Sequence, residues 1–177
     1  MKSRILGAGL LAALWLPLAA WAAPVTVALS PSNMLAQTHS RAMFLSVTGT
    51  FSQLSGTLTY DPAADTCTVD VTFVVESLKL PNALIRSQTM SKGFLDPQDY
   101  PTQHYAGTCA GGLLRGQLTM RGQTHEFDMA VTNEMAGGQL TGFHLEGTLN
   151  RYDWGLNGLT LTVGKMIRVT NDIVLSH

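Results

Sequence analysis

Apolar residues occupy every second position through much of this 177-residue chain, and the alternation is most regular over residues 116–131. Leu118 and Met120 share one strand face before a glycine-containing turn, and Phe127 and Met129 share one face after it. Because successive side chains of a strand point to opposite faces, this pattern predicts a hairpin with one apolar and one polar face. Such strands bury their apolar faces when one sheet curls on itself or two sheets stack.

Strand-like segments continue along the chain, separated by glycine, proline and aspartate turns. The expected strands lie at about residues 34–40, 47–60, 66–77, 103–108, 113–121, 124–133, 139–150 and 159–175. Residues 81–93 are the one stretch predicted to hold a helix, since Pro81 suits a first turn and Gly93 an end. We therefore predict an all-β fold of about eight antiparallel strands in an up-and-down arrangement, with one short helix between the third and fourth strands. About eight strands is the number whose closed barrel can hold one small ligand.

The N-terminal residues have the pattern of an export signal. Two basic residues precede an apolar run over residues 5–21, which ends at the small-x-small cleavage pattern Ala20-Trp21-Ala22. We therefore expect residues 1–22 to be a secretory signal peptide and residues 23–177 to form a single exported domain. A lone transmembrane anchor is the competing interpretation, and the run is short for a membrane span.

The charge balance argues against a polyanionic partner. The formal net charge is -1 and the calculated pI is about 6.5, and no basic stripe or acidic tail interrupts the chain. We therefore expect no binding to nucleic acid or to an anionic membrane surface. Charged residues make up 13% of the chain, about half the usual share, and Thr, Ser, Asn and Gln supply the polar positions instead. This composition favours an exported all-β protein.

Six segments in order along the chain resemble the YceI-like family of exported lipid-binding barrels. They lie at residues 47–51, 56–61, 94–101, 118–124, 142–143 and 151–156. The resemblance implies an antiparallel barrel of lipocalin type whose lumen takes a long apolar molecule such as a polyisoprenoid, an isoprenoid quinone or a fatty amide. Membership of the family establishes no enzymatic activity. Residues 34–39 lack the aromatic residue usual in the first strand of the family, and residues 102–107 lack its apolar alternation.

The candidate ligand-binding residues are those on the apolar strand faces. They are Val71, Phe73, Val75, Leu118, Met120, Phe127, Met129, Val131, Phe143, Leu145, Leu149, Ile167 and Val169. Burial of apolar area contributes roughly 25 cal/mol per Å², so a long tail would gain several kcal/mol by partition into such a lumen. The alternation fits a lumen filled by these side chains equally well, and that alternative stays open.

Two cysteines in an exported chain predict a disulfide. Cys67 begins the third expected strand and Cys109 follows the fourth, so the two lie side by side if those strands are antiparallel neighbours. A redox-active or metal-binding pair is the alternative, but the close C-x-x-C spacing is absent. The five histidines form no H-x-H or H-x-x-x-H arrangement, so we predict no metal site and no cofactor.

Catalytic signatures are missing from the sequence. It contains no G-x-S-x-G elbow and no glycine-rich phosphate loop between a strand and a helix, so we predict no enzymatic activity and no catalytic residue. We expect Arg151 and Asp153 to pair at one end of the barrel, and we consider Arg86 and Arg121 as contacts for a ligand head group at its rim.

The functional hypothesis is binding or transport of an apolar long-chain lipid in the barrel lumen, in the periplasm. One alternative is a filled structural barrel whose outer surface acts on a membrane redox or envelope-stress partner. Another is a small redox or metal protein that uses Cys67 and Cys109. The expected partner is an apolar small molecule, whereas transient contact with a membrane or membrane protein and formation of a homodimer stay open.

Overall fold

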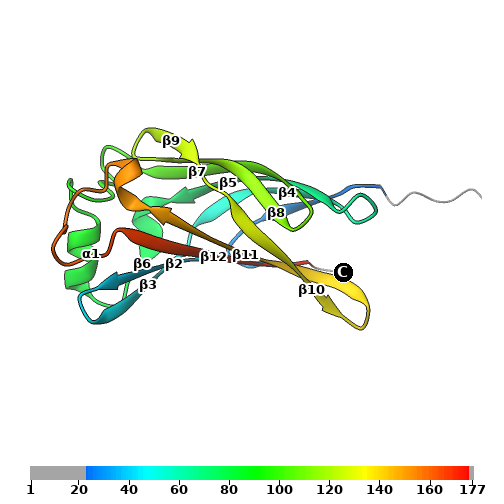
Figure 1. Cartoon of the computed structure of the whole chain (residues 1–177), viewed down its shortest axis with the longest axis horizontal. Coiled ribbons are helices and arrows are strands. Elements are labelled where there is room, and N and C mark those ends of the chain that lie inside the picture. Colours follow the sequence, from blue (N-terminus) through cyan, green and yellow to red (C-terminus); the bar gives the residue numbers. More distant parts are fainter. Residues whose placement is uncertain (1–22, 176–177) are drawn as a thin grey trace, which may run out of the picture.

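The computed structural model describes residues 23–175, and they form one curled antiparallel sheet (Figure 1). The predicted signal peptide and His177 lie outside the described residues. The strands are β1 (Val25–Leu29), β2 (Met34–Ala42), β3 (Leu45–Phe51), β4 (Leu54–Asp61), β5 (Thr66–Val74), β6 (Leu78–Lys79), β7 (Thr102–Ala110), β8 (Leu113–Met120), β9 (Gln123–Glu126), β10 (Met129–Ala136), β11 (Gln139–Asn150) and β12 (Met166–Val174). The helical elements are η1 (Val75–Ser77), α1 (Ala83–Thr89) and η2 (Arg151–Trp154).

The twelve strands group into eight continuous runs of chain. Short bends or one 3-10 turn separate β1 from β2, β3 from β4, β5 from β6 and β9 from β10, and joining these four pairs leaves eight runs. The strand order is β1-β4-β5-β7-β8-β10-β11-β12-β2-β3-β6, with β9 paired to β8. The run that holds β1 and β2 pairs through β1 with β4, and through β2 with β12 on one side and β3 on the other. The predicted all-β antiparallel fold is confirmed, and its eight strands correspond to the eight runs.

Side chains alternate between the two faces of the sheet as the sequence predicts. In β5, Cys67, Val69, Val71 and Phe73 are buried, whereas the residues between them face outward. The inward-facing side chains of the other strands join them in one apolar core. The curled sheet therefore encloses a single apolar interior.

Glycine allows close packing where β7 and β8 meet. A Cβ atom on Gly116 would lie 2.5 Å from the Tyr105 hydroxyl oxygen, so a larger residue has no room there. The buried Tyr105 hydroxyl donates a hydrogen bond of 3.0 Å to the Phe127 carbonyl oxygen. Burial, together with the negative charge of Asp128, raises the pKa of Tyr105 above its ordinary value. This contact ties the hairpin that follows Gly116 to the wall of β7.

The single α-helix of the described chain covers one end of the curled sheet. The Asn82 side chain caps α1 by accepting a hydrogen bond of 2.9 Å from the Ile85 amide. α1 lies between the third and fourth runs, as predicted, and ends at Thr89, before Gly93. Figure 1 shows α1, η2, the β2–β3 turn and the loop before β12 at the same end of the molecule, called here the α1 end.

Several strand boundaries differ from the prediction. The expected strand at 47–60 is two strands, because the chain bends at Ser52 and Gln53 and pairs with different partners on each side. The expected strand at 124–133 is divided in the same way between β9 and β10, and the last strand begins at Met166 rather than near residue 159. β1 is an additional strand. Among residues 23–175, no helix is both long and apolar enough to cross a membrane.

Candidate functional site

The interior of the curled sheet contains a cavity of about 140 Å³. Side chains from both walls of the sheet line it, among them Val71 of β5, Leu118 of β8 and Leu145 of β11. Its lining also includes Gln88 of α1, which is exposed to solvent, so the cavity reaches the surface at the α1 end. The lining is mainly aliphatic, aromatic and thioether, which suits an apolar ligand.

Ten of the thirteen predicted ligand-binding residues line this cavity. They are Val71, Phe73, Leu118, Met120, Phe127, Met129, Leu145, Leu149, Ile167 and Val169. Their meeting in one place follows from the curl of the sheet, because β5, β8 and β11 are not neighbours in strand order. Their role in ligand binding stays a prediction.

The other three predicted residues lie elsewhere. Val75 is buried in η1, where the chain leaves the strand pattern, and it does not line the cavity. Val131 and Phe143 line a second cavity of about 570 Å³, at the end of the sheet opposite α1. The two cavities share no lining residue.

An aromatic contact lies across the sheet interior at the edge of the second cavity. The rings of Tyr60 in β4 and Phe143 in β11 meet edge to face, with centroids 5.6 Å apart. Because β4 and β11 are not neighbours in the sheet, this contact bridges opposite walls. We call it the aromatic partition, since both rings line the second cavity and neither lines the first.

Several cavity residues are absent from the prediction. β2 contributes Met34, Ala36 and Thr38, and α1 contributes Ile85. The alternation of β2 is hidden in the sequence because small and polar residues occupy its inward positions near the mouth. The position of α1 over the end of the sheet leaves no periodic signal at all. The inward side of β2 therefore becomes evident only from its pairing with β12.

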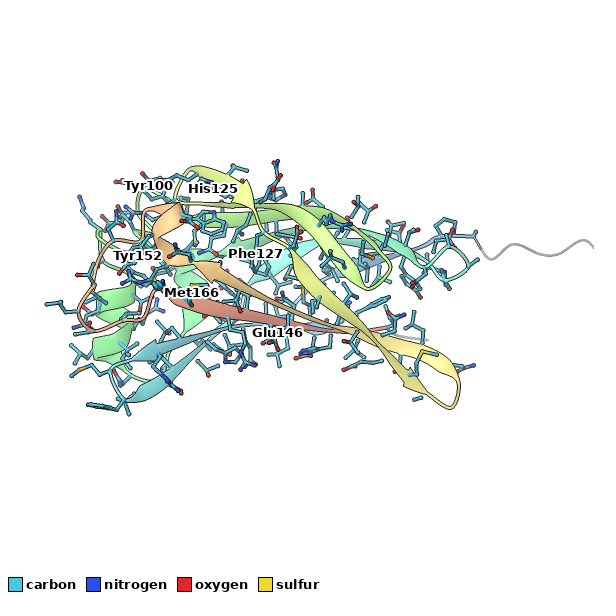
Figure 2. All side chains as sticks on the ribbon, viewed as in Figure 1. Tyr100, His125, Phe127, Glu146, Tyr152 and Met166 are labelled. Atoms are coloured by element: carbon cyan, nitrogen blue, oxygen red, sulfur yellow. A yellow bond between two sulfur atoms is a disulfide. The ribbon has the colours of Figure 1, made fainter. Side chains whose placement is uncertain are left out.

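Arg151 organises the loop that frames the cavity mouth, and the expected pair with Asp153 is wrong. The Arg151 side chain is fully buried and donates to the carbonyl oxygens of Leu156, Gly158, Val163 and Gly164. Its guanidinium carbon also lies 4.4 Å from the ring centroid of Tyr152, which Figure 2 places at the α1 end.

Asp153 takes part in a different contact. Its carboxylate accepts a hydrogen bond of 3.2 Å from the Asn150 side-chain amide. A planar guanidinium with five donors matches a loop that turns several carbonyls inward, which explains why Arg151 needs no carboxylate here. The spacing of Arg151 and Asp153 in the sequence gives no sign of this arrangement.

The two arginines considered for a ligand head group have partners within the protein. Arg86 lies 2.5 Å from the Glu76 carboxylate and donates to the Leu78 carbonyl oxygen at 2.7 Å, which ties α1 to the preceding chain. Arg121 donates to the Gly155 carbonyl oxygen at 2.7 Å and stacks over the Tyr100 ring at 5.3 Å. Both side chains therefore fasten the elements that cover the α1 end.

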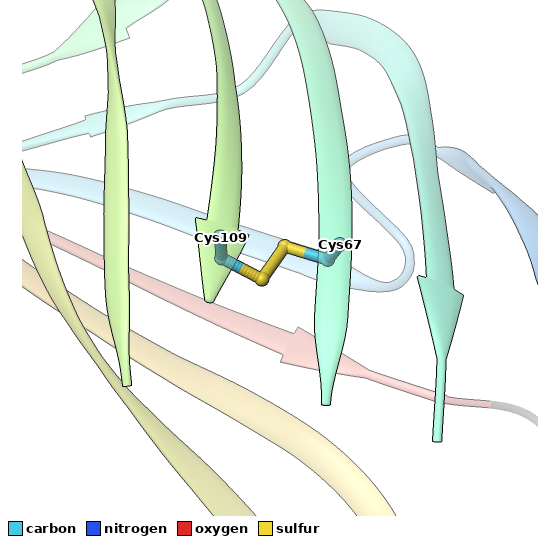
Figure 3. Close-up of a disulfide and its surroundings, with 2 residues drawn as sticks. All are labelled: Cys67 and Cys109. Atoms are coloured by element: carbon cyan, nitrogen blue, oxygen red, sulfur yellow. A yellow bond between two sulfur atoms is a disulfide. The ribbon is translucent and has the colours of Figure 1, made fainter. Parts of the chain in front are cut away.

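Cys67 and Cys109 form a disulfide between β5 and β7 (Figure 3). The two residues are directly opposite each other in the pairing of these strands, with Cα atoms 4.8 Å apart. The bridge lies in the lining of the second cavity, at the end opposite α1. Within residues 23–175, no group of three or more His, Cys, Asp or Glu side chains is placed to hold a metal ion.

Ionisable side chains gather on the outer face of β11, β12 and β2. His144 Nδ1 lies 2.5 Å from the Asp172 carboxylate, and this hydrogen bond raises the pKa of His144 above its ordinary value. Arg168 contacts the Glu146 carboxylate at 3.4 Å, and Figure 2 shows Glu146 midway along the sheet. Burial and the charge of Arg168 lower the pKa of His39. The cluster faces away from the cavity.

The chain is similar to known proteins in sequence. The model of the YceI-like domain family matches residues 28–175. A UPF0312 protein of Pseudomonas putida strain GB-1 is 29% identical over 122 residues, which make up 62% of this chain and 64% of that protein. The chain spans between 28% and 64% of the length of the curated relatives it matches.

Solved structures share the fold at low sequence identity. BcnA of Burkholderia cenocepacia superposes with a TM-score of 0.70 at 19% identity, over 82% of this chain and 98% of that one. A polyisoprenoid binding domain from Saccharophagus degradans, implicated in plant cell wall breakdown, superposes with a TM-score of 0.58 at 12% identity, over 85% of this chain and 98% of that one. At these identities the likeness shows the fold alone.

Proposed function

Because the chain belongs to the YceI-like domain family, we propose that it binds a long apolar lipid, such as a polyisoprenoid, an isoprenoid quinone or a fatty amide, in the cavity of its curled sheet. The observation that carries the proposal is the apolar cavity of about 140 Å³ that opens at the α1 end. One water needs roughly 10–15 Å³ of such space, so the cavity has room for part of an acyl or isoprenoid chain. The polyisoprenoid binding domain among the structural neighbours supports this ligand class.

The composition of the lining supports a ligand that is held by shape and apolar contact. Met34, Met120 and Met129 lie in the wall, and thioether side chains repack around irregular apolar shapes. A change of rotamer in these methionine side chains therefore enlarges the cavity for a longer ligand. The apolar tail lies towards the aromatic partition, and the polar head lies at the mouth, near Gln88 and Thr89.

The same proposal places the protein in the periplasm. The pattern of residues 1–22 and the bridge between Cys67 and Cys109 support it, because disulfides persist in oxidising compartments outside the cytosol. The protein then acts as a carrier or a store of lipid and performs no chemical step itself.

The test is mass spectrometry of an organic extract from protein purified out of its native compartment without detergent. We expect one long-chain isoprenoid or fatty species in stoichiometric amount. An empty extract, together with no uptake of added isoprenoid quinone or fatty amide, would overturn the proposal. A function on the outer surface of a filled barrel would then be the better explanation.

A pair of matched variants locates the ligand within the molecule. Val169 and Val131 are both half-buried, but Val169 lines the cavity and Val131 lies outside it. Val169→Phe fills part of the cavity, so we expect the amount of extracted lipid to fall about tenfold. Val131→Phe adds the same side chain outside the cavity and should leave the extract unchanged. Equal loss in both variants would place the ligand elsewhere.

A further inference from the structure

We propose that the protein docks on an anionic lipid bilayer through an apolar tip at the α1 end, formed by Met43, Phe44, Leu45 and Leu161. The inference rests on the proposed function, because it names the surface with which the cavity exchanges its lipid. It depends on four features of the described chain: the exposure of these side chains, the support of the loops that carry them, the local charge and the position of the cavity mouth.

Large apolar side chains are exposed side by side on two loops. Phe44 is 97% exposed and Leu161 is 98% exposed, and their neighbours Met43 and Leu45 are each about two-thirds exposed. The two loops meet, because the Met43 amide donates a hydrogen bond of 2.8 Å to the Thr162 carbonyl oxygen. Clustered apolar side chains of this size on a surface indicate a site of interaction.

The loop that presents Leu161 is firmly supported. The buried guanidinium of Arg151 binds the carbonyl oxygens on both sides of Leu161, those of Gly158 and Val163 among them. The Val163 amide also donates to the Leu159 carbonyl oxygen at 2.8 Å, which closes a turn around the exposed leucine. Leu161 therefore projects from a fixed turn, whereas a loosely held loop would be free to fold it inward.

The charge around the apolar tip suits an anionic surface. Residues 41–48, 81–93 and 157–166 contain four basic residues and no Asp or Glu, although the whole chain has one more acidic than basic residue. Glu76, which precedes α1, is paired with Arg86, and Asp96, which follows it, is buried, whereas Asp99 and Asp153 just outside these ranges are exposed. The overall charge predicts no anionic membrane partner, and the excess of basic residues within these three ranges is what changes that expectation. Basic residues beside apolar side chains favour binding to bilayers that contain anionic lipids.

The cavity opens beside the same tip. Ala42, which precedes Met43, lines the cavity, as does Val163 two residues after Leu161. Insertion of the tip into the interface would bring the mouth close to the acyl region of the bilayer. A lipid could then move between the bilayer and the cavity with little exposure of its tail to water. Transfer through water would expose the apolar area of the whole tail, which is unfavourable.

A tryptophan at the tip reports on docking. Trp154 is the single tryptophan of residues 23–177 and is buried, so a second one gives a separate signal. Phe44→Trp should shift its emission to the blue and be quenched by brominated lipids in vesicles of phosphatidylethanolamine and phosphatidylglycerol. Met135→Trp, at an exposed apolar position near the end of β10 at the far end, is the matched control and should not change.

Three other outcomes of this experiment would contradict the proposal. A blue shift in buffer alone that grows with protein concentration would identify a second copy of the chain as the partner. Equal shifts for both tryptophans would show adsorption without orientation. An unchanged Phe44→Trp spectrum with vesicles would show that the tip stays in water.

Loss of docking and loss of lipid binding are separable. Phe44→Ser combined with Leu161→Ser should weaken vesicle binding about tenfold or more, while the amount of added isoprenoid quinone that the purified protein takes up at equilibrium, without vesicles, stays at the wild-type level. The control combines Met135→Ser with Val174→Ser, since both residues are 58% exposed and lie away from the tip. Wild-type protein that carries lipid but ignores vesicles would overturn docking alone. Protein that binds vesicles but carries no lipid would overturn the proposed function alone.

Discussion

At the scale of single residues, the buried arginine at position 151 is the most consequential side chain of the α1 end. It is fully buried without a carboxylate partner among the hydrogen bonds and ion pairs of residues 23–175. Its charge is distributed over inward-turned carbonyl dipoles and two aromatic rings. The shape of the cavity mouth therefore depends on one side chain that lies outside the cavity.

Replacement of this arginine should loosen the mouth. Arg151→Met leaves several buried carbonyl groups without donors, so we expect the free energy of unfolding to fall by at least about 3 kcal/mol. Urea denaturation measures the loss, and hydrogen exchange should accelerate most at the amides of Met43 and Gly164, which bond across the two loops. Arg168→Met removes an exposed guanidinium and should change stability little. Equal effects of both changes would show that Arg151 does not organise the loops.

Two histidines on the outer face should make stability depend on pH with opposite signs. The hydrogen bond to Asp172 raises the pKa of His144 above its ordinary value of 6.5. A raised pKa in the folded state stabilises the fold fully below the unfolded-state pKa, and this contribution disappears as pH rises through the folded-state pKa. His144→Gln should therefore destabilise the protein at about pH 5.5 and have little effect at about pH 8.5.

His39 provides the internal comparison. Burial and the nearby Arg168 lower its pKa, so protonation of His39 opposes folding at low pH and has no effect at high pH. His39→Gln should accordingly gain stability relative to wild type as the pH falls from about 8 to about 5. Urea denaturation at a series of pH values measures both variants. Parallel pH profiles for the two would contradict the assignment.

At the scale of elements, the disulfide joins two adjacent strands at the end opposite the cavity mouth. Cys67 and Cys109 are 42 residues apart in sequence, and the chain between them includes α1 and the loop that follows it. The bridge therefore restricts the unfolded chain over a long stretch, while it does not line the proposed binding site in the folded protein.

Loss of the bridge should lower stability and spare lipid binding. Cys67→Ala combined with Cys109→Ala should reduce the free energy of unfolding by about 3–4 kcal/mol in the chain-entropy model. Urea denaturation with and without a thiol reductant measures this, and the double variant should be insensitive to the reductant. The amount of extracted lipid should not change. A variant as stable as wild type would contradict the entropic account.

The sequence predicts the elements better than it predicts their partners. The alternation of Val69, Val71 and Phe73 predicts β5 and its inward face, because burial imposes period two on the sequence. The division between β3 and β4 is not predictable in this way, because Ser52 and Gln53 bend the chain without a glycine or proline. β1 does carry a signal, the alternation of apolar residues from Val25 to Leu29.

The candidate site is less predictable from the sequence than the fold, because alternation shows which face of a strand points inward but not where along the interior a residue lies. Alternation assigns Val131 and Phe143 to the inward side correctly, but it does not say at which end of the interior they lie. Val75 keeps the period of β5 although the chain has already turned into η1. The partners of Arg151 are backbone carbonyls, which leave no mark on the sequence. Position along the axis of the sheet and contacts to backbone need the structure.

At the scale of the whole molecule, the interior is divided into two cavities that share no lining residue. The two rings of the aromatic partition, Tyr60 and Phe143, line the second cavity and do not line the first. A ligand that enters from the mouth therefore has a limited depth available to its tail.

Removal of one ring of the aromatic partition should increase the maximum length of the ligand that the protein binds. Tyr60→Ala removes one of the two rings of the partition, so we expect binding of isoprenoid chains longer than the longest that the wild-type protein accepts. Competition binding with a series of chain lengths measures the limit. Leu140→Ala, which also lines the second cavity but lies outside the aromatic partition, should leave the limit unchanged. An unchanged limit in Tyr60→Ala would show that the partition does not determine ligand length.

The pairing of β2 with β12 also determines when the interior can form. His39 pairs with Arg168, near the opposite end of the chain, and the other pairings of these two strands are equally distant in sequence. Contacts of such separation form late, since the intervening chain must first be brought together. In a chain synthesised from its N-terminus, β2 has no partner on that side until the final strand arrives. The proposed loading with lipid therefore has to wait for completion of the polypeptide, and a C-terminally truncated chain would have no closed interior to fill.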